Sequence, residues 1–168
     1  YIVFVDSDTA MMPDTLSRFV LSLTESGADA ISGIYHLNPL NNGLVPLYKS
    51  MFEFYTFDRR GTCSYDVFNG AIGVIRAEVF HAAEGYDSNI RWGMDFENED
   101  FGHRLVENYK LILEPSIQVR HHFPHFMRLT EAYFRRVSLW VELFLTRRKF
   151  EQTGPATSTI GLATLSVP

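Results

Sequence analysis

Two aspartates one residue apart follow an apolar run at the start of the sequence. Residues 1–5 are apolar or β-branched throughout, and Asp6-Ser7-Asp8 ends the run abruptly. Such a run predicts a central strand of a parallel sheet, and ligands of these sheets bind beyond the carboxyl ends of the strands. Strand alternation would place Asp6 and Asp8 on one side. The pair therefore predicts a Mn²⁺ or Mg²⁺ site that bridges to a diphosphate, with a solvated helix-capping turn as the alternative.

A second group of acidic residues lies close to residue 100. Asp95, Glu97, Glu99 and Asp100 occur within a short stretch that is predicted to begin a helix over residues 97–108. A positioned carboxylate can take the proton from an acceptor hydroxyl group during its attack. Alternatively, acids in a first helical turn complement the helix dipole.

Two adjacent histidines, His121 and His122, could extend the predicted metal site. In an extended strand, Ile117, Val119 and His121 share one side, and His122 faces the other. A neutral imidazole is a suitable ligand for Mn²⁺ and would complete the site begun by Asp8. The alternative is a capping or surface histidine.

The elements that must hold these residues alternate between strand and helix. Pro13 and Asp14 open a predicted helix that Gly27 ends, and Ala30–Tyr35 is predicted as the next strand. The apolar face of that helix is made of Leu16, Phe19, Val20 and Leu23. Further strands are predicted at 68–76, 110–114 and 117–122, and further helices at 77–83, 97–108 and 126–150. Residues 45–58 are rich in aromatic side chains and fit neither pattern. The succession predicts an α/β sandwich.

Two glycines and one tryptophan could contribute to ligand binding at the predicted site. Gly70 and Gly73 would let the backbone approach a ligand closely, or would relieve a crowded strand. Trp92, beside Gly93, could stack on a sugar ring or pack as an ordinary aromatic residue.

Composition narrows the class of protein. The 168 residues suffice for one domain with a sizeable core, and the net charge of -5 argues against a nucleic-acid partner. Cys63 is the one cysteine, so no internal disulfide can form. No run reaches the roughly 18–20 apolar residues of a membrane span.

The charge is unevenly distributed along the chain. Residues 120–149 contain seven Lys or Arg and two Glu, which suggests an anionic surface or partner at that end. The predicted helix over 126–150 has apolar residues beyond one stripe and so predicts an interfacial helix at a membrane surface, with packing on the core as the alternative. Arg135 and Arg136 could hold a donor phosphate or form a solvated helix face.

Six segments together resemble one enzyme family. Residues 4–8 with Pro13 resemble a motif made of a hydrophobic strand, Asp-x-Asp and a later proline. Residues 69–76 resemble a Gly-rich strand that ends in Arg. Residues 84–87 resemble a turn with the pattern Gly-aromatic-Asp. Residues 97–105 match an acidic helix, residues 108–110 with Pro115 match an aromatic-Lys segment before a proline, and residues 119–122 match a terminal histidine. In this order and spacing, the chain resembles the family 2 glycosyltransferases of the GT-A fold over about residues 1–125.

The resemblance implies an α/β, GT-A-like mixed sheet flanked by helices and truncated at the N-terminus, because the nucleotide-binding part of the family precedes the Asp-x-Asp strand. Residues 1–125 would be the C-terminal part of the catalytic domain, 126–150 an amphipathic helix that could be membrane-interfacial, and 151–168 a linker or tail that could lead into a transmembrane segment. The location implied is the cytoplasmic face of a membrane.

The implied reaction moves a sugar from a nucleotide-diphosphate sugar to a glycan, lipid or other acceptor, with Mn²⁺ or Mg²⁺ as cofactor. Asp6, Asp8 and His121 would hold the metal, and Gly70 and Arg76 would lie at the donor. Two other functions stay open: a non-catalytic sugar-binding scaffold and a nucleotidyltransferase.

The alignment of residues 97–105 with the acidic helix of the family determines which residue the resemblance implies as the catalytic base. Reading Glu99-Asp100 as the acidic pair of the family leaves Arg104 two residues too close. Alignment on residues 101–105 places Glu97-Asn98 at the pair and Asp100 at the second acid. Asp100 is then the first candidate for the catalytic base, Glu97 the second and Glu99 a third. Asn98 cannot act as a base, so the anomeric outcome stays open.

Overall fold

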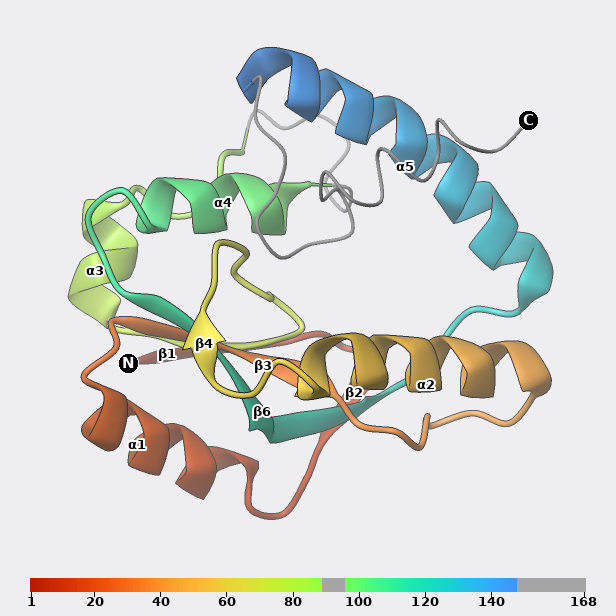
Figure 1. Cartoon of the computed structure of the whole chain (residues 1–168), viewed down its shortest axis with the longest axis horizontal. Helices are drawn as coiled ribbons and strands as arrows, with labels where there is room; N and C mark the ends of the chain where they lie inside the picture. Colours follow the sequence, from red (N-terminus) through yellow and green to blue (C-terminus); the bar gives the residue numbers. More distant parts are fainter. Residues whose placement is uncertain (89–95, 148–168) are drawn as a thin grey trace.

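The computed structural model describes residues 1–88 and 96–147 (Figure 1). Its strands are β1 (Ile2–Val5), β2 (Thr9–Met11), β3 (Ala30–Tyr35), β4 (Cys63–Ser64), β5 (Ile72–Ile75) and β6 (Leu111–His121). Its helices are α1 (Thr15–Ser26), α2 (Leu44–Asp58), α3 (Ala77–Ala82), α4 (Glu97–Leu105) and α5 (Phe126–Arg147). The predicted roles of Trp92, Asp95 and the tail 151–168 lie outside the described residues, as do the side chains of Arg135 and Arg136.

The strands form one mixed sheet, which confirms the predicted α/β class. The strand order is β1-β5-β3-β6-β2, and β4 pairs with β6. The β3–β6 pair is parallel, whereas the β1–β5, β3–β5, β2–β6 and β4–β6 pairs are antiparallel.

The prediction that residues 1–5 form a central parallel strand is wrong for this structure. Within the described residues, β1 pairs with β5 alone, and its side chains alternate between half-buried and exposed. Ile2 and Phe4 pack on the core, while Val3 and Val5 face solvent. An apolar run indicates that a strand is partly buried, but it does not indicate how many strands pair with it or whether they are parallel.

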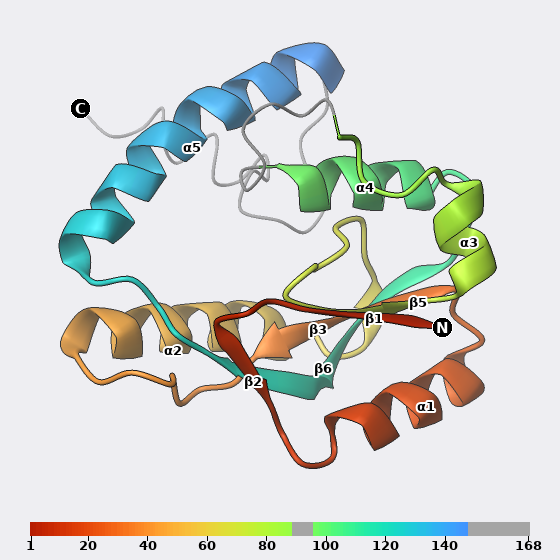
Figure 2. The same ribbon diagram turned by 180° about the vertical axis from the view of Figure 1, so that it is seen from behind.

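Helices cover both faces of the sheet (Figures 1 and 2). On one face, Phe19 and Leu23 of α1 pack with Ile31, Ile112 and Ile117 of the sheet. On the other face, α3 and α4 lie over a second core cluster, to which α2 also contributes. Aromatic side chains fill much of this second cluster, namely Phe4, Phe54, Phe57, Tyr65, Phe68, Phe80, Tyr86, Phe101 and Tyr109.

Helix α1 has the predicted bounds but only half of its predicted apolar face. Gly27 ends it in a left-handed conformation, with φ 62° and its N–H bonded to the Leu23 carbonyl. Leu16 and Val20 are exposed, although both were predicted to face the core. Thr15 is fully buried instead, because its hydroxyl group donates to the Gln118 carbonyl of β6.

The two strands predicted at 110–114 and 117–122 form one strand, β6, with an irregularity around Pro115. Ser32 of β3 pairs with Leu113 and Ile34 pairs with Gln118, so two residues of β3 span five of β6. The bulged strand comes so close to Gly33 that a Cβ atom there would lie 2.6 Å from the Ile117 carbonyl oxygen. The structure therefore requires glycine at this position.

Replacing Gly33 by alanine is expected to lower the free energy of unfolding by about 3 kcal/mol, because a backbone oxygen cannot move aside easily. Gly61→Ala is the matched control, since no atom lies within 4 Å and its φ of +64° is the sole obstacle. The control should cost about 1 kcal/mol. Urea denaturation compares the two variants, and an equal loss in both would contradict the proposed collision.

Candidate functional site

The Asp6-Ser7-Asp8 segment forms a tight turn between β1 and β2. The Asp6 carbonyl accepts hydrogen bonds from the Thr9 backbone N–H at 3.2 Å and from the Thr9 hydroxyl at 2.8 Å. Strand alternation, on which the prediction relied, therefore ends at Val5. After the turn, β2 pairs with the end of β6, with Thr9 opposite His121. The three residues of β2 were not predicted, yet they place the two predicted metal-binding segments side by side.

The structure brings two of the predicted ligands, Asp8 and His121, close together. Asp8 Oδ1 lies 3.4 Å from His121 Nε2, and the His122 backbone N–H donates to the Asp8 carbonyl at 2.9 Å. Asp8 reaches solvent, whereas only 14% of the His121 side chain is exposed. The imidazole ring packs against Tyr35 and Phe123, with centroid distances of 4.7 and 4.5 Å. His121, rather than His122, thus faces the aspartates.

Burial and charge together set the protonation of this group. Burial lowers the pKa of His121, and the negative charges of Asp8 and Asp6 oppose that shift without reversing it. Partial burial raises the pKa of Asp6, the Asp8 carboxylate raises it further, and Glu97 adds to the effect. His121 therefore favours the neutral form, which is the form that binds metals.

The donor atoms at this turn fit one divalent cation in part. Two ligands about 2.1 Å from a shared cation, at roughly right angles, are about 3 Å apart. The Asp8–His121 separation of 3.4 Å is close to that value. Over residues 1–88 and 96–147, however, no group of three or more His, Cys, Asp or Glu side chains is arranged to hold a metal ion. The donor atoms whose spacing fits a cation are thus two, Asp8 Oδ1 and His121 Nε2.

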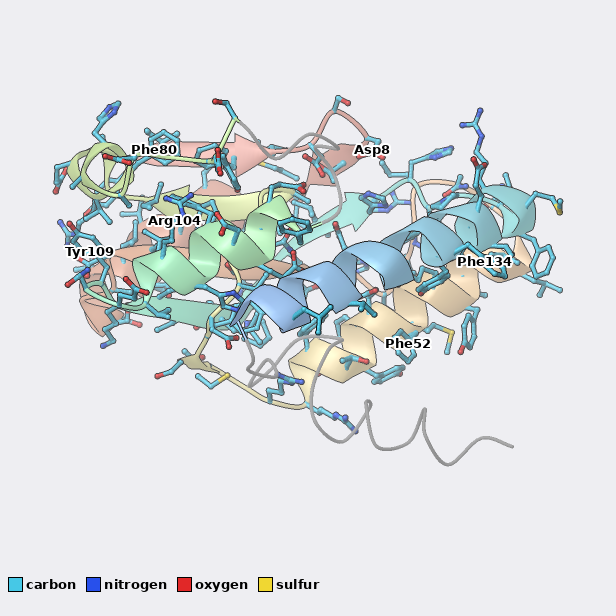
Figure 3. The ribbon with its side chains drawn as sticks, turned by 90° about the horizontal axis from the view of Figure 1, so that it is seen from above. Asp8, Phe52, Phe80, Arg104, Tyr109 and Phe134 are labelled. Atoms are coloured by element: carbon cyan, nitrogen blue, oxygen red, sulfur yellow. The ribbon has the colours of Figure 1, made fainter. Side chains whose placement is uncertain are left out.

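The acids of α4 have different surroundings. Asp100, the first candidate for the base, pairs with Arg104 at 3.0 Å, and Arg104 also donates to the carbonyl oxygens of Ala83 and Gly85, at 2.6 Å each. These contacts join α4 to the turn after α3; Figure 3 labels Arg104 and Asp8 in separate parts of the molecule. The structure thus gives Asp100 a structural partner, and its assignment as the base stays a prediction.

Glu97 is the acid of α4 whose charge raises the pKa of Asp6. Its charge acts on the Asp6 carboxyl group and on the Tyr86 hydroxyl group, whose pKa is raised by burial, Glu97, Asp6 and Glu99, in that order. Tyr86 consequently keeps its proton and can donate a hydrogen bond. The sequence predicts a turn at Tyr86 but carries no signal for the partner of its hydroxyl group.

Asn98 connects α4 to the Gly-rich segment. Its Oδ1 atom accepts hydrogen bonds from the Gly70 N–H at 3.0 Å and from the Tyr86 hydroxyl at 3.2 Å, and its carbonyl accepts from the Phe68 N–H at 3.1 Å. A Cβ atom on Gly70 would lie 2.9 Å from both Asn98 Oδ1 and Tyr86 Oη. Of the two roles predicted for Gly70, the structure bears out the relief of crowding.

Gly73 and Arg76 differ in how they relate to the site. A Cβ atom on Gly73 would lie 2.7 Å from the Asn69 carbonyl oxygen and 2.7 Å from the Phe68 ring. Gly73 therefore also relieves crowding at its strand. Arg76, predicted to lie at the donor, follows Ile75, which pairs with Ile2 at the opposite end of β1 from Asp6, and its assignment stays a prediction. There its guanidinium lies 3.5 Å from Asp29 and over the Tyr1 ring.

Comparison with known proteins adds no family. No family model matches the chain, and no curated protein matches it. In the part of the chain that the structure describes, no helix combines the length and apolarity needed to cross a membrane.

Asn98→Leu is expected to lower the free energy of unfolding by about 2–3 kcal/mol, because the Gly70 N–H and the Tyr86 hydroxyl would both lose their acceptor. Tyr86→Phe, which removes one donor and leaves no buried group unpaired at Asn98 Oδ1, should cost about 1 kcal/mol. Chemical denaturation measures both. A larger loss for Tyr86→Phe would show that Asn98 is not the centre of this network.

Proposed function

We propose that the protein is a metal-dependent glycosyltransferase of the GT-A type, which moves a sugar from a nucleotide-diphosphate sugar to an acceptor hydroxyl group. The observation that carries the proposal is the β2–β6 pairing, which sets Asp8 Oδ1 3.4 Å from His121 Nε2. Two segments that resemble the metal-binding motifs of family 2, more than a hundred residues apart, thereby meet at one turn.

Asp8 and His121 would hold Mn²⁺ or Mg²⁺, with Asp6 beside them. The cation would supply positive charge for a diphosphate leaving group. Asp8 offers a carboxylate oxygen that reaches solvent, and the buried, neutral His121 offers its Nε2 atom. A site with two protein ligands is usual where substrate phosphates complete the coordination.

Glu97 is the residue that we assign to the acceptor. Its carboxylate is close enough to affect the pKa of Asp6 and of Tyr86, whereas the Asp100 carboxylate binds Arg104. A base must reach the proton that it removes, and the contact of Asp100 with Arg104 supports Glu97 in this role. The Asn98 contacts with Gly70 and Tyr86 would keep the first turn of α4, and with it Glu97, in position.

Asn98 also favours a second candidate, a non-catalytic sugar-binding scaffold. An amide stands at a position where the resembled family has an acid, so one potential base is missing. The two functions differ in turnover: the scaffold would bind a nucleotide-diphosphate sugar or a glycan without cleaving the donor.

The first test measures Mn²⁺ binding to the full-length protein by electron paramagnetic resonance, and hydrolysis of UDP-sugars and GDP-sugars with and without Mn²⁺. Asp8→Asn and His121→Ala are each expected to weaken Mn²⁺ binding at least about tenfold. Asp58→Asn, at an exposed acid that ends α2, is the control. Unchanged Mn²⁺ binding in both site variants would refute the metal site, and sugar binding without turnover would favour the scaffold.

The second test separates the two acids of α4. Glu97→Gln is expected to lower kcat by about 10²–10⁴-fold, because a general base is lost while size is kept. Asp100→Asn should lower the melting temperature through its broken pairing with Arg104 and change kcat far less. Steady-state kinetics and thermal unfolding of both variants check this. The reverse pattern would restore Asp100 as the base.

A further inference from the structure

Helix α2 has two apolar faces, and one of them is exposed. Toward the sheet, Pro46 and Ser50 are buried, and Phe54 and Phe57 pack against the core. On the outer side, five side chains, each three or four residues from another of the set, are 40–87% exposed: Leu44, Tyr48, Met51, Phe52 and Tyr55. This double pattern explains why residues 45–58 could not be assigned from sequence. A helix needs one apolar face to pack on its own core, so the outer face has another use.

Helix α5 presents a second exposed apolar line. Met127, Phe134, Val141 and Leu145 are 51–78% exposed, and their spacing of seven, seven and four residues keeps them on one side of the helix. Glu131 lies near this line, so its apolar character is less continuous than that of α2. This exposure agrees with the interfacial helix predicted from sequence and disagrees with an α5 that packs wholly on the core.

Lys49 joins the two helices. Its Nζ donates to the Tyr133 hydroxyl of α5 at 3.0 Å and pairs with Glu53 of α2. The same ammonium group lies over the rings of Phe52 and Tyr133, 5.7 and 5.4 Å from their centroids. Figure 3 labels Phe52 on α2 and Phe134 on the neighbouring α5. We call the outer side chains of α2 and the exposed line of α5, listed above, the aromatic surface.

Charge indicates the kind of partner that the aromatic surface fits. Residues 44–60 and 120–149, which contain α2 and α5, hold ten of the fifteen Lys and Arg residues of the chain but four of its twenty Asp and Glu residues. Arg59 continues the outer face of α2 at its end, and Arg128 is exposed on the first turn of α5. The rest of the chain is strongly acidic. The partner should therefore be both apolar and anionic.

We propose that the aromatic surface of α2 and α5 lies on an anionic lipid bilayer. Tyr and Phe side chains would enter the interfacial region, Leu44 and Met51 would reach the acyl chains, and Arg59 would meet lipid phosphates. A second copy of the chain fits less well, because a symmetric contact would bring basic segments against each other. This surface does not depend on sugar transfer, so the proposal stands or fails separately from the proposed function.

The test is co-sedimentation of the full 168-residue chain with vesicles of equal parts phosphatidylcholine and phosphatidylglycerol, and with pure phosphatidylcholine vesicles. We expect binding to the anionic vesicles that added salt weakens. The triple variant Tyr48→Ser, Phe52→Ser, Tyr55→Ser should reduce the partition at least about tenfold. The matched control is Leu16→Ser, Val20→Ser, Leu21→Ser, which removes equally exposed apolar residues from α1 and should stay within about twofold.

Circular dichroism checks that the variants fold, and Arg59→Glu provides a milder change that should weaken binding to the anionic vesicles alone. Three results would overturn the proposal. One is equal binding by the α2 and α1 triple variants. Another is a dimer, seen by light scattering, that the α2 variant dissolves. The last is binding to a single-stranded oligonucleotide, seen by fluorescence anisotropy, without binding to vesicles.

Discussion

Three residues of β2 pair with the end of β6, and this short ladder determines where the candidate site lies. It turns the chain back directly after Asp6-Ser7-Asp8 and sets Thr9 opposite His121. Asp8 and His121 lie more than a hundred residues apart in the sequence, and this ladder brings their segments together. The hydrogen bond from the His122 N–H to the Asp8 carbonyl extends the same ladder into the turn. Backbone pairing therefore places Asp8 beside His121.

The site concentrates negative charge beside partly buried groups, and the protein limits that charge in two ways. Tyr86 keeps its proton, because burial and the charges of Glu97 and Asp6 raise its pKa. Asn98 provides an acceptor for Gly70 and Tyr86 without a further negative charge. A carboxylate there could make the same hydrogen bonds, but it would repel Glu97 and Asp6.

Sequence patterns predicted the elements whose signals are local. Gly27 marked the end of α1, β3 has its predicted bounds, and the pairing of His121 with the aspartates was anticipated. The errors concern what a local pattern cannot report. The apolar run of β1 did not reveal its antiparallel partner, and β2 is too short to show a period. The alignment with the resembled family that made Asp100 the first candidate for the base gave no sign of its contact with Arg104, which depends on how α4 meets the turn at Ala83 and Gly85.

The bulge opposite Gly33 changes, partway along β6, the face of the sheet toward which the odd-numbered side chains point. Before it, Leu111 and Leu113 point into the cluster beneath α4; after it, Ile117 and Val119 point into the cluster beneath α1. Residues of odd number thus change sides within one strand, because the strand gains an odd number of residues at Pro115. By strand alternation, His121 lies on the same side of β6 as Ile117 and Val119. Removing a single residue from the bulge would swap His121 with His122, so the length of this irregular stretch decides which imidazole reaches Asp8.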